Sequence, residues 1–402
     1  MASRSEKSTS EKRTLAFMVM TYAAGPTMTC RVTPIVQHLR ERGVHVTVYA
    51  LSEAFPGHIA QTQILGEPVY LIGQTHFTLA PNGTKLRFGP LRYFREVLKT
   101  SERLLTDLRK EKIRVVQVFT TDPGALLLAI YLRAHGLKVL LDVDDSTYGM
   151  GVMAGYPKPV LCLQWFLENV IPRFFKTLST GSSSRCRQYP GCNHLPIPIK
   201  REVFARSKPP CNQPIVTVIM VGTMATAHLH LQVIEIIPEI VRKNKRIRFC
   251  FIGTGERLAS IRERVATLGL QSFVELPGYL SREETIRRMC EADIGICPVG
   301  NNPFDRSRIP MKILEYMAAG LCVVSAPIGD IPEFIRHLEN GWLYRPDDMG
   351  DFAQAILGLA DQPNLVQRLA HQAKLDSKKY EVDQVAPIWF DFYQKAAQWK
   401  PI

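Results

Sequence analysis

The sequence contains no uninterrupted apolar run that approaches the roughly 18 residues of a membrane-spanning helix. Residues 1–13 are polar and mixed in charge, and they lack the apolar segment of a secretory signal peptide. We therefore expect a disordered lead-in over residues 1–13 and a cytoplasmic location. Hydrophobic residues make up 46% of the chain, a fraction typical of a globular protein rather than a disordered one.

Paired cysteines are also missing. The nine cysteines occur singly, without a C-x-x-C pair, and most lie in apolar segments, so we expect reduced thiols of the core. Zinc-finger spacing, a helix-turn-helix and an aromatic RNA-binding motif are absent as well, so nucleic acid is not an expected partner. The net charge of +13 instead favours a phosphate-rich small molecule or an anionic membrane surface.

The chain is long enough for two domains, because 402 residues exceed one hydrophobic core. After residue 200 comes a polar, proline-containing segment, R-E-V-F-A-R-S-K-P-P-C-N-Q-P, which is typical of a linker. The sequence therefore predicts a first domain over residues 14–200 and a second over residues 201–385.

Both halves open with a buried strand, a glycine-containing loop and a helix. In the first half the strand covers 15–20 and the helix 32–42, without the G-x-G-x-x-G pattern of a dinucleotide site. In the second half a strand ends at Gly222, and the next strand leads into Gly253-Thr254-Gly255-Glu256. Such loops let backbone N–H groups approach a phosphate at a helix start, and the pattern predicts Rossmann-like domains.

A pair of carboxylates follows another strand of the first half, at the end of the segment K-V-L-L-D-V-D-D. Asp144 and Asp145 lie where functional residues collect in parallel sheets. Three interpretations stay open: a functional acid–base group at the sheet edge, a D-x-D metal motif with Asp142, or a cap of the next helix.

Residues 91–112 predict a strongly amphipathic, basic helix. Its apolar side is formed by Leu91, Phe94, Leu98, Leu105 and Leu108. We expect this side to pack on the sheet. A membrane-surface role of the basic side is the alternative.

The most informative segment covers residues 305–326, D-R-S-R-I-P-M-K-I-L-E-Y-M-A-A-G-L-C-V-V-S-A. It predicts a polar loop, an apolar helix that ends at Gly320, and a strand buried on both faces. Glu315 follows Lys312 by three residues, so the two charges share one side of the helix. A carboxylate there can accept hydrogen bonds from both hydroxyls of a ribose, while the lysine faces phosphate. A solvated Lys–Glu pair on a core helix is the simpler interpretation.

This segment resembles the C-terminal signature of glycosyltransferase family four, the group 1 glycosyltransferases of GT-B fold. The family pattern is a glutamate, seven residues, a second glutamate, and then an A-x-G-x-P-V-V run. Glu315 occupies the position of the second glutamate, which contacts the ribose of the nucleotide in the family. Ser307 replaces the first, which contacts the donor sugar.

The resemblance implies an α/β protein of GT-B type, with two Rossmann-like domains whose parallel sheets face an interdomain cleft. The first domain would bind the acceptor and the second the nucleotide-sugar donor, and the helix over residues 386–402 would pack back on the first domain. The implied reaction moves a sugar from a nucleoside-diphosphate sugar to an acceptor hydroxyl, with retention and without a metal or other cofactor. A nucleotide-sugar epimerase and an inactive binding or scaffold subunit of the same fold are the alternatives.

The resemblance also assigns residues to roles. Asp144, with its neighbour Asp145, stands where the family often has a histidine beside the reacting sugar. Gly25, Thr27 and Arg31 are expected on the acceptor side. The expected donor residues are Gly222, Thr223, Gly253, Thr254, Gly255, Glu256, Tyr279, Leu280, Ser307, Arg308, Pro310, Met311, Lys312 and Glu315.

One feature of the family is missing from the first glycine loop of the second half. The family has an arginine and then a lysine there, which neutralise the pyrophosphate, whereas this chain has Thr223 and A-T-A-H-L. We expect Arg306, Arg308 and Lys312 to supply that charge. The remaining partner is an acceptor of unknown type, with a peripheral contact to an anionic membrane as a further hypothesis.

Overall fold

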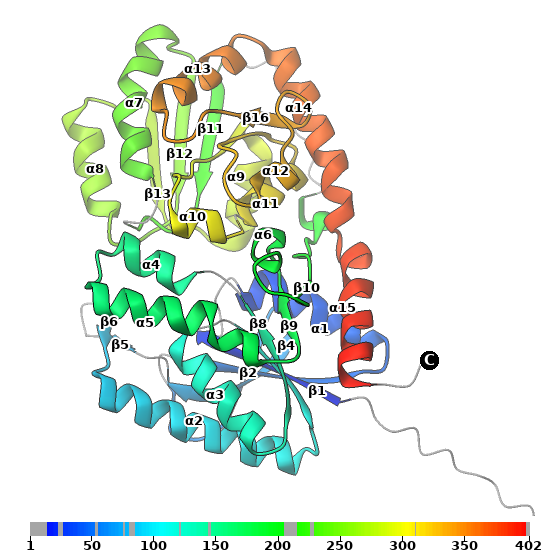
Figure 1. Ribbon diagram of the computed structural model, residues 1–402. Helices are drawn as coiled ribbons and strands as arrows, with labels where there is room; N and C mark the ends of the chain where they lie inside the picture. Colours follow the sequence, from blue (N-terminus) through cyan, green and yellow to red (C-terminus); the bar gives the residue numbers. More distant parts are fainter. Residues whose placement is uncertain are drawn as a thin grey trace, which may run out of the picture. The chain divides into compact units, whose positions relative to one another are not determined.

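The structure, a computed structural model, shows two compact units (Figure 1). Unit 1 combines Met1–Asp142, Phe174–Ser179 and Ala386–Ile402, and unit 2 combines Val143–Arg173 and Thr180–Val385. The described residues are 14–22, 27–52, 55–74, 77–79, 85–119, 122–143, 146–204, 215–225, 229–309 and 311–398.

Unit 1 is built on a sheet whose strands run in the order β9-β8-β7-β1-β2-β4-β3. Neighbouring strands are parallel except β3 and β4, which form an antiparallel pair at the edge. The strands are β1 (Thr14–Tyr22), β2 (His45–Ser52), β3 (Ala60–Ile64), β4 (Glu67–Gln74), β7 (Val115–Phe119), β8 (Lys138–Asp142) and β9 (Leu178–Thr180). Two short strands, β5 (Phe77–Leu79) and β6 (Lys85–Arg87), form a separate antiparallel pair.

The helices of unit 1 connect these strands in βαβ order. The helical elements are the π-helix η1 (Thr27–Val32), α1 (Thr33–Glu41), α2 (Pro90–Lys110), α3 (Pro123–Ala134), the 3₁₀ turn η2 (Ile171–Phe174) at the unit boundary, and α15 (Val382–Ala397). Local sequence explains the start of α3: Asp122 accepts hydrogen bonds from the amides of Gly124 and Ala125, and Pro123 occupies the first helical position.

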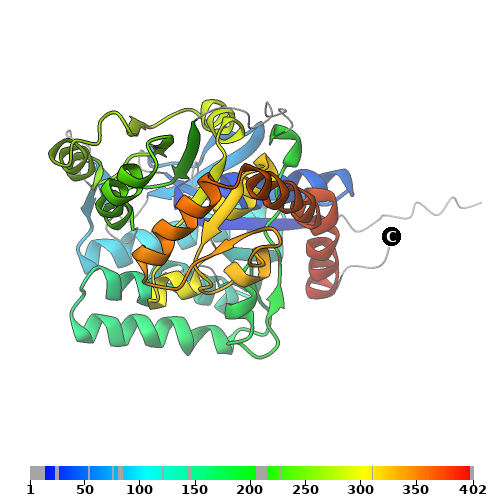
Figure 2. The ribbon, with the colours of Figure 1, turned by 90° about the horizontal axis from the view of Figure 1, so that it is seen from above.

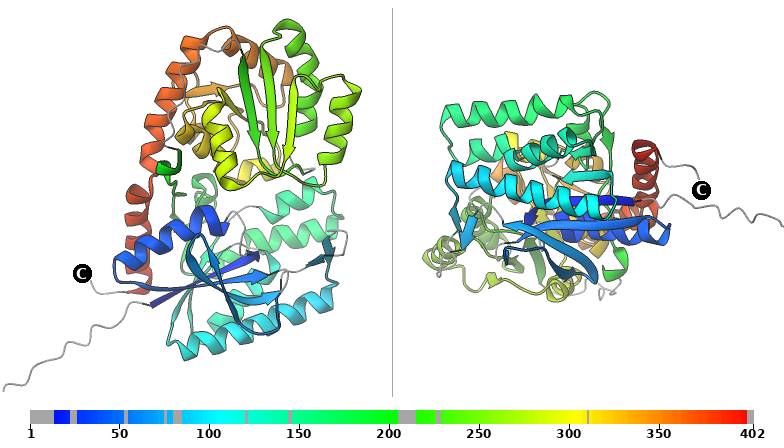
Figure 3. Two further views of the ribbon diagram at one scale, coloured as in Figure 1. Left: turned by 180° about the vertical axis from the view of Figure 1, so that it is seen from behind. Right: turned by 90° about the horizontal axis from the view of Figure 1, so that it is seen from below.

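Unit 2 contains a parallel sheet of the order β13-β12-β11-β14-β15-β16. Figure 3 shows its strands from behind. They are β11 (Val216–Val221), β12 (Ile247–Ile252), β13 (Val274–Gly278), β14 (Ile294–Cys297), β15 (Cys322–Ser325) and β16 (Gly341–Leu343). All four residues of β15 are buried, as expected for a strand covered on both faces.

The helices of unit 2 form two groups around this sheet. Helix α7 contacts α8 and α13, while α11 contacts α9 and α14 (Figures 1 and 2). The principal helices are α7 (His230–Lys243), α8 (Leu258–Thr267), α9 (Arg282–Glu291), α10 (Pro303–Ser307), α11 (Met311–Ala319), α12 (Ile331–Phe334), α13 (Met349–Ala360) and α14 (Pro363–Asp376). Smaller elements are α4 (Thr147–Met153), α5 (Lys158–Asn169), α6 (Ser183–Cys186), β10 (Asn193–His194), η3 (Arg201–Phe204) and η4 (Ser377–Tyr380).

The predicted α/β class, with two Rossmann-like units on parallel-dominated sheets, is confirmed. One packing prediction is wrong in part. In α2, Leu105 and Leu108 are buried as expected, but Leu91 is 90% exposed and Phe94 is 49% exposed. The first turn of this helix packs instead through Tyr93, whose hydroxyl donates a hydrogen bond of 3.4 Å to Asp122. No described helix has the length and apolar character needed to cross a bilayer.

A buried ion pair lies at the centre of unit 1. Arg31 in η1 and Asp142 at the end of β8 are 2% and 0% exposed, and their two nitrogen–oxygen distances are 2.6 and 3.0 Å. Ser179 donates a hydrogen bond of 2.6 Å to the same carboxylate. The Arg31 guanidinium lies 5.2 Å from the ring of Trp389 in α15. The pair thus connects strand, π-helix and C-terminal helix within the interior of unit 1.

We expect Arg31→Met to lower the free energy of unfolding by about 3–5 kcal/mol, because it leaves the Asp142 carboxylate buried without its cation. Urea unfolding would measure the loss. The double variant Arg31→Met/Asp142→Asn should recover part of it, since the uncompensated charge is gone. The control is Lys99→Met on α2, which removes an exposed pair with Glu96 and should change stability by less than about 1 kcal/mol. Equal losses in Arg31→Met and Lys99→Met would contradict the assignment.

Candidate functional site

Three loops of unit 2 meet at the carboxyl ends of its strands. The amide of Gly222 after β11 donates to the carbonyl of Ile252 at 3.0 Å, and the amide of Gly253 after β12 donates to Gly278 at 2.9 Å. The amide of Met224 reaches the Thr254 carbonyl at 3.0 Å. The predicted donor residues of the glycine loops are therefore brought together, with Tyr279 and Leu280 directly after Gly278.

The glycines of the second loop are required by close backbone approach. Gly253 has φ +146°, and a Cβ there would lie 1.9 Å from the Gly222 carbonyl oxygen. Gly255 has φ +158°, and its Cβ would lie 2.4 Å from the Met224 carbonyl oxygen. The loop before α8 is thus pressed against the loop before α7, and this packing gives the glycines a structural role beside any contact with phosphate.

Helix α11 is fixed against the same edge by its tyrosine. The Tyr316 hydroxyl accepts a hydrogen bond of 2.8 Å from the amide of Val221, the last residue of β11. The Tyr316 ring also covers Gly295 of β14, where a Cβ would come within 2.6 Å of it. This contact fixes α11, which carries Glu315, at the carboxyl end of β11, the strand that leads into Gly222.

Glu315 is 4% exposed, yet its carboxylate faces two cations rather than apolar side chains. Lys312 Nζ lies 2.5 Å from one oxygen, and Arg282 Nη1, at the start of α9, lies 2.6 Å from the other. Burial raises the pKa of Glu315, but the Lys312 and Arg282 charges and hydrogen bonds outweigh it and hold the pKa below 4.5. The carboxylate is therefore ionised at neutral pH. Because Arg282 is 48% exposed, it can leave the carboxylate without crossing the core.

Sequence reasoning found Lys312 but missed Arg282. The two residues differ in their separation from Glu315: Lys312 lies one helical turn away, whereas Arg282 comes from another helix and 33 positions earlier in the chain. Only the packing of α9 against α11 brings it into place. No local pattern near residue 282 could have indicated it.

The polar loop before α11 is held by a buried aspartate. Asp305 is 2% exposed and accepts hydrogen bonds of 2.8 Å from the amide of Gly300 and from Asn302. Arg308 lies 2.6 Å from the same carboxylate, so this guanidinium is engaged within the loop. Arg306 is exposed and donates to Asn301. Of the three cations expected to face phosphate, Lys312 alone is in contact with Glu315.

Ser307, which replaces the family's first glutamate, lies at the end of α10 and is buried. Its hydroxyl donates to the Phe304 carbonyl at 2.8 Å and accepts a hydrogen bond of 3.3 Å from the amide of Ser146. Gly149 of α4 packs on the same segment, where a Cβ would lie 2.7 Å from Phe304 Cα. Ser307 therefore connects α10 to the start of α4.

Some of the expected site residues lie outside the described residues, namely Gly25, Asp144, Asp145 and Pro310. Of the others, Thr27 begins η1, and Met311 begins α11. Arg31 is inside unit 1 and paired with Asp142, so its side chain does not face solvent.

The Arg31–Asp142 pair argues against the interpretation of Asp142 as part of a D-x-D metal motif. Both oxygens of Asp142 accept hydrogen bonds from protein groups, so this carboxylate does not offer an open ligand to a metal ion. In the part of the chain that the structure describes, no group of three His, Cys, Asp or Glu side chains is arranged to hold a metal ion.

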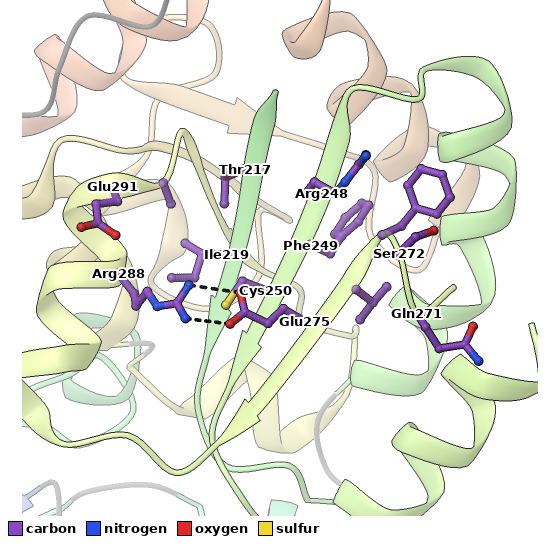
Figure 4. A pocket seen from close by; sticks show the side chains of 13 residues that line it. Thr217, Ile219, Arg248, Phe249, Cys250, Gln271, Ser272, Glu275, Arg288 and Glu291 are labelled. Atoms are coloured by element: carbon purple, nitrogen blue, oxygen red, sulfur yellow. Dashed lines mark hydrogen bonds and ion pairs between the residues drawn. The ribbon is translucent and has the colours of Figure 1, made fainter. Parts of the chain in front are cut away.

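A separate groove of about 580 Å³ lies over β11, β12 and β13 (Figure 4). Thr217, Arg248 and Glu275 line it, and Arg288 forms an ion pair of 2.7 Å with Glu275 at its side. These three lining residues lie near the amino-terminal ends of their strands. The groove is thus displaced toward the opposite end of the sheet from the glycine loops, and none of the predicted donor residues lines it.

Residues 215–362 match the sequence model of the family "Glycosyl transferases group 1", which confirms the resemblance over this range. A 135-residue stretch is 35% identical to the amylovoran biosynthesis glycosyltransferase AmsK of Erwinia amylovora and covers 32% of this chain and 33% of that protein. The stretches that align with curated relatives span about a third of the relatives' own length.

Solved structures extend the likeness to the whole fold. Sucrose-phosphate synthase from Thermosynechococcus elongatus superposes with a TM-score of 0.75 at 13% identity, over 96% of this chain and 100% of that one. Anabaena HepE in complex with UDP-glucose superposes with a TM-score of 0.68 at 15% identity, over 96% and 99%. The predicted GT-B fold is therefore confirmed.

We expect Gly253→Ala to destabilise unit 2 more than Gly269→Ala does. Both glycines have positive φ, but no atom lies within 4 Å of a Cβ at Gly269, which follows α8. Gly269→Ala should cost about 1–3 kcal/mol of strain. Gly253→Ala should cost about 1–3 kcal/mol more, because the Gly222 carbonyl must move. Urea unfolding of the two variants compares them, and equal losses would argue against the close approach.

The charges around Glu315 predict a pH dependence of stability. Because the folded pKa is lowered, the ionised carboxylate stabilises the protein above pH 4.5, and this contribution is lost as the pH falls through the folded pKa. In Arg282→Gln/Lys312→Met, burial acts alone and raises the pKa, so stability should instead fall as the pH rises above 4.5. The free energy of unfolding relative to Glu315→Gln, followed over pH in each background, measures both signs. The same sign in both backgrounds would contradict the pairing.

Proposed function

We propose that this chain is a glycosyltransferase that moves a sugar from a nucleoside-diphosphate sugar to an acceptor hydroxyl. The observation that carries the proposal is the ionised Glu315 carboxylate on α11, a helix that is hydrogen-bonded to the end of β11, where the two mutually bonded glycine loops begin. The group 1 match over residues 215–362 covers the same loops and the same helix. The UDP-glucose complex of HepE, a structure of similar fold, supports a nucleotide sugar as the donor class.

On this proposal each group has a distinct task. Glu315 accepts hydrogen bonds from the two ribose hydroxyls after Arg282 and Lys312 turn away from it, because these two cations occupy both of its oxygens in the free protein. The two cations are then free to approach the diphosphate, which needs the positive charge that Thr223 does not supply. The glycine loops bring backbone N–H groups toward the phosphates at the start of α8.

The reaction that fits this arrangement proceeds with retention. The leaving diphosphate accepts the proton of the acceptor hydroxyl as that oxygen attacks the anomeric carbon from the same face. Lys312 and the amides at the helix start stabilise the charge that develops on the leaving phosphate. We propose that no metal ion takes part, since Lys312 and Arg282 supply cations on this side of the donor.

A binding subunit without transferase activity is the second candidate, and Ser307 favours it. The family's first glutamate contacts the donor sugar, whereas Ser307 is occupied with Phe304 and Ser146. Such a protein would bind the nucleotide as well as an enzyme does but would not turn it over.

Donor binding tests both candidates at once. A thermal-shift screen of nucleoside diphosphates and their sugars should raise the melting temperature, since a ligand of the folded state stabilises it. Lys312→Met should raise the dissociation constant of the best ligand by about tenfold, because a charge-assisted contact with phosphate is lost. Lys243→Met on α7, which removes an exposed lysine paired with Glu239, is the matched control and should bind normally.

A measurement of the nucleoside diphosphate released from the bound sugar donor then distinguishes the transferase from the binding subunit. Turnover supports the transferase, and binding without turnover supports the binding subunit. A screen in which no nucleotide shifts the melting temperature would reject both.

A further inference from the structure

Helix α5 turns its apolar residues toward solvent. It covers Lys158–Asn169, K-P-V-L-C-L-Q-W-F-L-E-N, and Glu168 is its one buried residue. A helix of a globular protein ordinarily buries its apolar stripe and exposes its charges, whereas α5 exposes apolar side chains and buries its one carboxylate. The large apolar side chains that it exposes are Val160 at 41%, Leu163 at 57%, Trp165 at 49% and Phe166 at 45%.

The helix is held in place by polar contacts at its last turn. The Glu168 carboxylate accepts hydrogen bonds of 2.9 Å from Ser146 Oγ, from the Tyr148 amide and from Arg185. The Tyr189 hydroxyl donates to the Glu168 carbonyl at 2.8 Å. Helix α4 lies against α5 as well (Figure 1). The exposed apolar residues are therefore not needed to position the helix, and their surface is presented by a fixed support.

The sequence segment that contains α5 is basic. Residues 146–187 contain a single acidic residue, Glu168, and it is buried in its pair with Arg185. Lys158 at the start of α5 and Arg173 after its end are exposed. The chain as a whole carries a net charge of +13. An apolar strip with cationic residues at both ends complements an anionic lipid surface.

The size of the strip also favours lipid over a protein partner. A helix of this length is about 18 Å long and about 10 Å wide, so its footprint is about 180 Å². A stable protein interface buries about 800 Å² on each partner. Insertion into a bilayer has no such requirement, since a few large side chains at the headgroup boundary suffice, and tryptophan and phenylalanine are favoured there.

We propose that α5 is a membrane-docking helix. Leu163 and Phe166, which share one side of the helix, insert between the headgroups of an anionic bilayer. Val160 and Trp165 flank them on either side, and Lys158 and Arg173 lie at the lipid phosphates. The proposal differs from the alternative drawn from the sequence, which gave this role to the basic side of residues 91–112. It is independent of the donor site, because α5 holds none of the residues assigned to the nucleotide.

Co-sedimentation of the full chain with vesicles tests the proposal. The protein should bind vesicles of phosphatidylcholine and phosphatidylglycerol, and bind vesicles of phosphatidylcholine alone less well. Leu163→Glu/Trp165→Glu should reduce binding by about tenfold or more, because charges replace the inserted side chains. Leu375→Glu on α14, an exposed leucine 40% accessible, is the matched control and should bind like the wild type.

A second measurement places the helix in the bilayer directly. Lipids with brominated acyl chains should quench Trp165, and the quenched component should be lost in Trp165→Phe while vesicle binding persists. The three substituted side chains, Leu163, Trp165 and Leu375, are each at least 40% exposed, so folding should be retained and nucleotide binding unchanged.

Four results would overturn the proposal. The first is wild-type binding by Leu163→Glu/Trp165→Glu, and the second is no binding of the wild type to either vesicle. The third is loss of binding in Leu91→Glu instead, which would assign docking to α2. A dimer that Leu163→Glu/Trp165→Glu dissociates, without vesicle binding, would assign the strip to a second copy of the chain and would also reject the lipid surface.

Discussion

A carboxylate removed from water needs a cation and hydrogen bonds, and this constraint organises the chain at several places. Asp142 is paired with Arg31, Glu168 with Arg185, and Glu315 with Lys312 and Arg282. The first two pairs are buried on both sides, so they fix segments of the fold. The partners of Glu315 are 31% and 48% exposed. Glu315 thus differs from the others because its cations can be exchanged for a ligand without disrupting the core.

Local pattern was sufficient for the elements whose burial follows from their own sequence. The strand over residues 15–20, the helix over 32–42 and the glycine-terminated helix near Glu315 appear as β1, α1 and α11. The Gly253–Glu256 loop was also predictable, since glycines between a strand and a helix permit close backbone approach. The position of Glu315 beside the glycine loops followed from the resemblance, and the Tyr316–Val221 contact supplies its physical cause.

The remaining features depend on contacts between distant segments, which no local pattern encodes. Arg31 is read from sequence as a residue at a helix start, yet it is buried because Asp142, 111 positions later, accepts its hydrogen bonds. Arg282 reaches Glu315 only through the packing of α9 on α11. The outward face of α5 could not be predicted either, since apolar composition alone indicates a core helix. Its support comes from Glu168, whose partners lie in α4 and α6.

The departure at Ser307 and the unusual face of α5 meet at one residue. Ser146 donates its hydroxyl to Glu168 of α5 and its amide to Ser307 of α10. The larger glutamate of the family pattern would replace a hydroxyl that is buried against the start of α4. A serine at this position therefore lets α4 and its neighbour α5 pack on α10 of unit 2.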